Sequence, residues 1–103
     1  MLNLIEQNLG ELVRLCRKYD VRRLDAFGSA VRGDFDLQRS DFDFLVEFNN
    51  FTVQNAADRY FGLLGDLEAL FGRKVDLISD QAIRNPYFRK AVDQERVNVY
   101  AAA

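Results

Sequence analysis

The chain has no histidine and no tryptophan, and it has one cysteine and one proline among its 103 residues. The absence of histidine excludes histidine acid–base chemistry and histidine-ligated zinc. Because Cys16 is the single cysteine, an internal disulfide and a metal site built from several cysteines are also excluded. We expect Cys16 to lie in the core, on the buried side of the first helix.

An excess of basic residues is also lacking. Lysine and arginine total 14 against 16 aspartate and glutamate residues, which gives a net charge of -2. A general nucleic-acid-binding protein normally has a basic excess, so we expect no direct DNA binding. The sequence contains no apolar run of transmembrane length and no signal-like N-terminus, so we expect no membrane contact and a cytoplasmic location.

What the chain does contain is a large apolar fraction. Hydrophobic residues make up 49% of the sequence, which excludes intrinsic disorder, and the length suits one domain over residues 1–103. Nine phenylalanines and four tyrosines are many for this length. They indicate either an aromatic-rich core or an apolar surface for a partner, and composition alone does not separate the two.

Hydrophobic periodicity predicts alternating helices and strands. The expected helices cover residues 3–19, 30–32, 53–70 and 86–93, with Thr52 as a cap and Gly72 as a stop for the third. The expected strands cover residues 21–27, 41–48, 74–79 and 97–100, the last at a sheet edge. The fold class is therefore α/β in the α+β sense: a small mixed β-sheet covered by helices.

Gly28 and Ser29 lie between an expected strand and a short helix. Glycine lets the backbone come close to a ligand, and a helix N-terminus offers free N–H groups to an anion. A Gly-Ser turn is common in proteins, so by itself this pair is a weak signal that favours an ordinary turn.

Three carboxylates stand in or next to expected strands. Asp41 and Asp43 are two residues apart, so in a strand they share a face, where they repel each other unless a cation binds. Asp76 interrupts the apolar strand KVDLIS, against strand propensity. If the two strands are neighbours, the three carboxylates converge, and hard oxygen ligands suit Mg²⁺. The alternative for Asp41 and Asp43 is a solvated strand edge.

Together, the segments GSAVRG, SDFDFLVEF and KVDLI resemble the minimal nucleotidyltransferases of the polymerase β superfamily. Among these, the chain most resembles the small MNT antitoxins of HEPN-domain RNase toxins, over nearly its whole length. The resemblance implies a polymerase β-like nucleotidyltransferase fold and nucleotidyl transfer with two Mg²⁺ ions. It places Gly28 and Ser29 on the nucleotide phosphates, and it makes Asp41, Asp43 and Asp76 the metal ligands and catalytic residues, with Asp76 also helping to deprotonate the acceptor.

The resemblance further implies AMP transfer from ATP to a tyrosine hydroxyl of a HEPN-type toxin. A chain of 103 residues has little structure left to bind a complex acceptor, so we expect the acceptor to be another folded protein. One alternative is an antitoxin that neutralises its toxin by binding alone. Another is an enzyme for small molecules, as in aminoglycoside nucleotidyltransferases, but those carry a further domain for the acceptor, and we expect none in this chain. Oligomerisation is possible in each case.

The loop before the carboxylates leaves some roles open. Eleven residues, 30–40, separate Gly28-Ser29 from Asp41, about one more than the commonest family spacing; the strand register should survive this. The family motif favours Arg32 as a nucleotide-binding residue. The remaining basic candidates, which are equally well explained as surface charges, are Arg39, Lys74, Arg84, Arg89 and Lys90.

Overall fold

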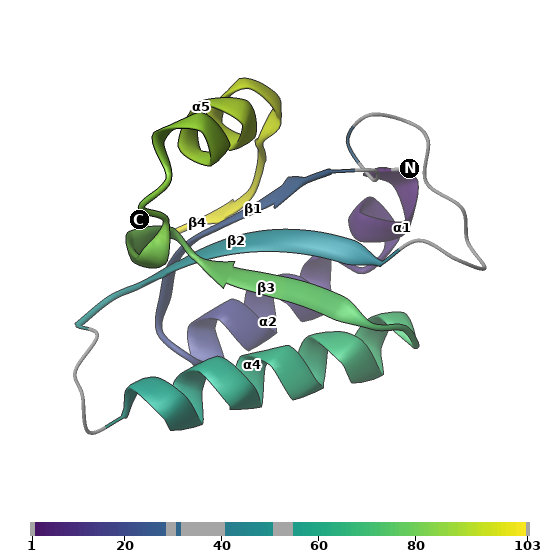
Figure 1. Cartoon of the computed structure of the whole chain (residues 1–103). Coiled ribbons are helices and arrows are strands. Elements are labelled where there is room, and N and C mark those ends of the chain that lie inside the picture. Colours follow the sequence, from purple (N-terminus) through teal and green to yellow (C-terminus); the bar gives the residue numbers. More distant parts are fainter. Residues whose placement is uncertain (1, 29–30, 32–40, 51–54, 103) are drawn as a thin grey trace.

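The computed structural model describes residues 2–28, 31, 41–50 and 55–102. Its centre is a four-stranded sheet with the strand order β3-β2-β1-β4 (Figure 1). The strands are β1 (Val21–Phe27), β2 (Phe42–Phe48), β3 (Val75–Ser79) and β4 (Val97–Ala101). β1 pairs antiparallel with β2 and with β4, whereas β2 and β3 are parallel. The predicted mixed sheet, with its last strand at an edge, is confirmed.

Helices cover both faces of this sheet (Figure 1). α1 (Leu2–Gln7), α2 (Leu9–Lys18) and α4 (Ala56–Phe71) lie on one face, and α5 (Pro86–Glu95) lies on the other. A short 3-10 helix, η1 (Asp80–Ala82), follows β3 and precedes α5 in the chain. No helix among the residues that the structure describes has the length and apolar character needed to cross a membrane.

The first helix departs from the prediction, because residues 3–19 do not form one continuous helix. Asn8 separates α1 from α2. Its side-chain amide donates to the Leu4 carbonyl at 2.8 Å, while its backbone N–H bonds to the Ile5 carbonyl at 3.1 Å. In a regular helix the Leu4 carbonyl would accept from the Asn8 backbone N–H. Here it accepts from the Asn8 side chain instead, a competition with the backbone that is common for asparagine.

The main core lies between the sheet and the helices α1, α2 and α4. Cys16 is fully buried there, as predicted, and burial raises the pKa of its thiol to about 12. An aromatic-rich core is also confirmed, since Phe42 and Phe71 pack with ring centroids 4.6 Å apart. The buried members of this core are Ile5, Leu12, Leu15, Cys16, Val21, Leu24, Ala26, Phe42, Phe44, Val46, Phe48, Leu63, Leu67, Phe71, Val75 and Leu77.

The end of α4 is as predicted, whereas its start is later. The helix stops at Gly72, which has a left-handed φ of 64° and whose N–H bonds to the Glu68 carbonyl. The first helical residue is Ala56, and the proposed cap Thr52 lies outside the described residues.

The opposite face of the sheet has a smaller core under α5. Phe27, Leu45 and Val92 are buried in it. α5 begins as Pro86 predicts, with the Asn85 side chain accepting from the first free N–H groups, and it continues to Glu95, two residues past the predicted end. This second layer brings the last helix over the ends of β1, β2 and β3.

Candidate active site

Asp43 on β2 and Asp76 on β3 are direct partners in the parallel register. Two residues further along each strand, Leu45 and Ile78 belong to the small core under α5. Because side chains two apart share a face, Asp43 and Asp76 project to the α5 side of the sheet. The structure therefore places these two predicted residues side by side, beyond the edge of the small core.

Asp41 lies directly before β2 and is half-buried. Within the described part of the chain, no three histidine, cysteine, aspartate or glutamate side chains are grouped closely enough to hold a metal ion. The structure thus brings Asp43 and Asp76 together but does not add Asp41 to them as a third ligand.

Gly28 follows β1 and approaches Asp43 closely. Phe27 pairs with Asp43 across β1 and β2, which places the next residue over the Asp43 side chain. Gly28 has a left-handed φ of +74°, and a Cβ built on it would lie 2.2 Å from Asp43 Oδ2. A glycine is required here for two reasons: other residues rarely adopt this φ, and any side chain would displace the Asp43 carboxylate.

A pocket of about 340 Å³ opens at this point, between the strand ends and α5. Its polar wall contains the Asp43, Asp76 and Glu95 carboxylates, and its apolar wall includes Phe88, whose ring meets the Phe27 ring edge-on at 6.4 Å between centroids. The described lining residues are Phe27, Gly28, Asp43, Asp76, Ile78, Phe88, Ala91, Val92 and Glu95.

The chemistry of this pocket suits a divalent cation. Asp43 and Asp76 offer hard carboxylate oxygens from adjacent strands, and they face an open cavity rather than a closed core. A cation would also offset the repulsion between the two carboxylates. We therefore take Asp43 and Asp76 as the described residues that fit a Mg²⁺ site.

Tyr60 connects α4 to the back of the same strand. Its hydroxyl donates to the Leu77 carbonyl, next to Asp76. Burial, and secondarily the negative charge of Asp76, raise the pKa of Tyr60. The phenol therefore stays protonated and keeps this hydrogen bond.

Other predicted residues are less well placed. Ser29, Arg32 and Arg39 lie outside the described residues. Lys74 is exposed immediately before β3. Of the C-terminal cluster, Arg84 and Lys90 are exposed, whereas Arg89 bonds within the chain, to Asp80.

Sequence reasoning missed Glu95, although it touches the site directly. Its Oε1 accepts a hydrogen bond from the Gly28 backbone N–H at 2.9 Å. The two residues are 67 positions apart, and no local pattern marks a glutamate at the end of a helix for such a contact.

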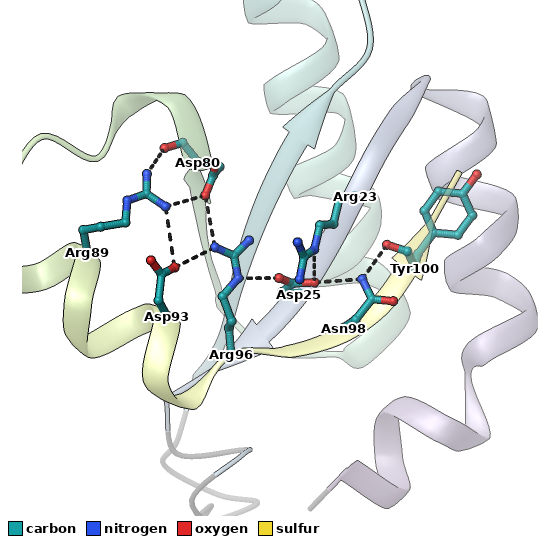
Figure 2. Close-up of polar contacts among 8 residues, drawn as sticks. All are labelled: Arg23, Asp25, Asp80, Arg89, Asp93, Arg96, Asn98 and Tyr100. Carbon is teal, nitrogen blue, oxygen red and sulfur yellow. Dashed lines mark hydrogen bonds and ion pairs between the residues drawn. The ribbon is translucent and has the colours of Figure 1, made fainter. Parts of the chain in front are cut away.

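Sequence reasoning also missed Asp25, which is completely buried in β1 (Figure 2). Asp25 Oδ2 accepts from Arg96 Nε at 2.5 Å, and Oδ1 accepts from Asn98 Nδ2 at 2.9 Å and from Arg23 Nε at 3.0 Å. Burial alone would raise the pKa of this carboxyl, but the bonds from Asn98, Arg96 and Arg23 outweigh it and hold the pKa below its ordinary value.

From Arg96 the network continues to α5 and η1 (Figure 2). Arg96 Nη1 lies 2.9 Å from Asp93 Oδ1 and 3.4 Å from Asp80 Oδ1, and Arg89 Nη1 lies 2.8 Å from the same Asp80 oxygen. These charge-assisted bonds join α5 and β4 to the middle of β1. They fix the end of the helix that carries Glu95.

The glycine requirement can be tested by replacing Gly28 with alanine. We expect the change to lower the free energy of unfolding by about 1–2 kcal/mol through left-handed strain, and to displace Asp43 enough to lower the activity of this pocket at least tenfold. Gly72→Ala is the matched control, because Gly72 is also left-handed (φ +64°) but has nothing within 4 Å of an added Cβ. If both variants keep full activity, the close approach of Gly28 to Asp43 has no functional role.

The family of this chain follows from comparison with known protein families. Residues 12–99 match the family described as Nucleotidyltransferase domain. This chain belongs to the nucleotidyltransferase domain family. The carboxylate pair beside the Gly28 turn is therefore the candidate active site of a nucleotidyltransferase, and the enzyme class predicted from the sequence is confirmed.

Curated relatives agree with this assignment. The chain is 37% identical over 82 residues to the Methanocaldococcus jannaschii protein named "Putative protein adenylyltransferase MJ1379", covering 80% of both chains. It is 37% identical over 87 residues to a second protein of that organism, named "Putative protein adenylyltransferase MJ0128", covering 82% of this chain and 83% of the relative.

Solved structures share the nucleotidyltransferase fold. A structure described as a "putative minimal nucleotidyltransferase" superposes with a TM-score of 0.69 at 29% identity, covering 93% of both chains. A toxin–antitoxin complex with AMP-PNP gives 0.70 at 19% identity, covering 92% of this chain and 74% of the other. A Shewanella oneidensis complex of a tri-AMPylated HEPN toxin with its MNT antitoxin gives 0.66 at 15% identity, covering 95% and 73%.

Proposed function

We propose that this nucleotidyltransferase transfers AMP from ATP to a hydroxyl group of a partner protein in a Mg²⁺-dependent reaction, with residues 1–103 as its single catalytic domain. The observation that carries the proposal is the pairing of Asp43 with Asp76 across parallel strands, in a pocket that the Gly28 turn overlooks. This is the side-chain chemistry that in-line transfer of a nucleotidyl group needs: acidic ligands next to a backbone that can approach phosphates.

Each residue has a role in this reaction. Asp43 and Asp76 would hold Mg²⁺, and Asp41, which the described geometry does not group with them, would have to turn toward the same ion to be a third ligand. The ion would supply charge neutralisation for the phosphates. The Gly28 N–H, with the proposed partners Ser29 and Arg32, orients the phosphate groups. The acceptor oxygen then attacks the α-phosphorus, the bond to the bridging oxygen of pyrophosphate breaks, and Asp76 takes the proton of the acceptor hydroxyl. Pyrophosphate leaves.

For the acceptor, we propose a tyrosine of a HEPN-type toxin, which would make this protein an antitoxin. The pocket volume of about 340 Å³ is near the lower end for small-molecule sites, so a bound nucleotide leaves little room for an enclosed acceptor. An acceptor side chain reaching in from another folded protein fits this size. The adenylyltransferase names of the relatives and the AMPylated toxin in a structural neighbour support the same choice. A cytoplasmic location, where ATP is available, is part of the proposal.

The test is an intact-mass measurement. The purified protein, ATP and Mg²⁺ are incubated with a candidate HEPN-type toxin, and the toxin should gain the mass of one or more AMP groups. Omission of Mg²⁺ should prevent the gain. A toxin that forms a complex with this protein but shows no mass change would refute AMP transfer to that partner.

A second function, neutralisation by binding alone, is favoured by exposed aromatic side chains. Phe61 on α4 and Tyr87 on α5 are 65% and 84% exposed, which is unusual for rings of this size. If binding is sufficient, an Asp43→Asn, Asp76→Asn double variant should still neutralise the toxin. Loss of neutralisation in a double variant that still binds the toxin would favour catalysis.

A further inference from the structure

The Gly28 N–H already has an anionic partner. Glu95 Oε1 accepts its hydrogen bond at 2.9 Å, and the Glu95 side chain lines the candidate pocket. A carboxylate oxygen that accepts from a backbone N–H makes the same kind of contact as a phosphate oxygen would make there. Glu95 and a nucleotide phosphate therefore compete for one donor.

The charge of the pocket adds to this competition. Its charged lining residues in the described part of the chain are the carboxylates Asp43, Asp76 and Glu95, and none of the described lining residues is a lysine or arginine. A polyphosphate without a bound cation is repelled by these three carboxylates, whereas a cation can offset Asp43 and Asp76. Glu95 lies on α5, away from the Asp43–Asp76 pair, and its carboxylate accepts from the same Gly28 N–H that would bind the phosphate.

The backbone of Glu95 is fixed, so only its side chain has to move when a phosphate displaces it from Gly28. Glu95 is the last residue of α5, between Val92 in the small core and Arg96, whose N–H bonds to the Val92 carbonyl at 2.8 Å. The Arg96 side chain is held by buried Asp25 and by Asp93. A rotation about the side-chain bonds of Glu95 can free Gly28 without moving the helix.

We propose that Glu95 is an internal competitor of the nucleotide: its carboxylate accepts the hydrogen bond of the Gly28 N–H, and an incoming phosphate has to displace it. The proposal rests on the proposed function, because it requires a phosphate to bind at Gly28. Its consequence is that the wild-type chain binds metal-free ATP more weakly than a chain without the Glu95 carboxylate.

Calorimetric titration with ATP, with and without Mg²⁺, tests this inference. Glu95→Gln keeps the shape but removes the charge, and Glu95→Ala removes the competitor. We expect both variants to bind metal-free ATP roughly five- to tenfold more tightly than the wild type. In the transfer reaction, KM for ATP should fall while kcat stays close to the wild-type value. Asp58→Asn is the control, because it removes an exposed carboxylate on α4 that belongs to neither the pocket lining nor the Arg96 network beside Glu95, and its affinity should stay within about twofold.

The outcomes separate this inference from the proposed function. If Glu95 only stabilises the Gly28 turn, both variants will bind ATP more weakly and melt at a lower temperature, which overturns the inference. If wild type and variants bind ATP equally, the inference is overturned and nucleotide transfer stands. If none of the proteins binds ATP under either condition, both fail. An equal gain in Asp58→Asn would assign the effect to general charge and also overturn the role of Glu95.

Discussion

Replacing Asp43 or Asp76 with asparagine should lower the rate of nucleotide transfer by roughly a thousandfold or more, because the reaction depends on charge neutralisation at the phosphates. The amide keeps the shape of the side chain but is a poor ligand for Mg²⁺. Because the two residues act on the same reacting group, the double variant should be little worse than either single variant.

The same substitutions should leave the fold intact. Asp43 and Asp76 are directly opposite each other, and like charges in that position destabilise a sheet. The melting temperature should therefore stay close to that of the wild type or rise. Asp58→Asn, an exposed change in the first turn of α4, is the control for activity and should retain the wild-type rate. A pair of variants that keeps near-normal transfer would remove these carboxylates from the active site.

The largest expected effect on stability is at Asp25. Asp25→Asn should lower the free energy of unfolding by about 3 kcal/mol, because it leaves the mostly buried Arg96 without its closest anionic partner. Asp93 and Asp80 remain near Arg96 and keep the loss from being larger. Denaturant unfolding measures the difference. The control Glu11→Gln breaks an exposed pair with Arg14, and its stability should be indistinguishable from that of the wild type.

The Asp25 contribution should also depend on pH. The pKa of Asp25 is lowered in the folded state, so its contribution is fully present above the unfolded value of about 3.9 and is lost as pH falls through the folded pKa. The stability difference between wild type and Asp25→Asn should thus be constant above about pH 5 and shrink below about pH 4. A constant difference down to pH 2 would show that Asp25 contributes through packing rather than through its charge.

Local patterns were sufficient to predict most of the framework. Alternation along residues 42–48 predicted β2 and its buried face, and the misfit of Asp76 in an apolar strand predicted its special position. Pro86 and Gly72 marked a helix start and a helix end correctly, because each imposes a backbone geometry that depends on no distant contact. The mixed sheet follows from the order of these elements.

What escaped prediction depends on contacts between distant residues. The hydrogen bonds that Gly28 donates to Glu95 and Arg96 donates to Asp25 span 67 and 71 positions. They exist because the antiparallel pairing of β1 with β4 brings the end of α5 across β1. Asp25 gave a partial signal, since an acidic residue inside the strand VRRLDAF needs a partner. Its partner could not be named without the topology.

The most direct test of the central claim follows the two ends of ATP separately. ATP labelled at the α-phosphate or at the γ-phosphate is incubated with this protein, Mg²⁺ and the proposed HEPN-type partner, and the label on the partner is measured. Nucleotidyl transfer predicts that the α-label becomes attached to the partner while the γ-label leaves as pyrophosphate. Attachment of the γ-label, or attachment of the α-label that persists undiminished in Asp43→Asn, Asp76→Asn, would contradict the account.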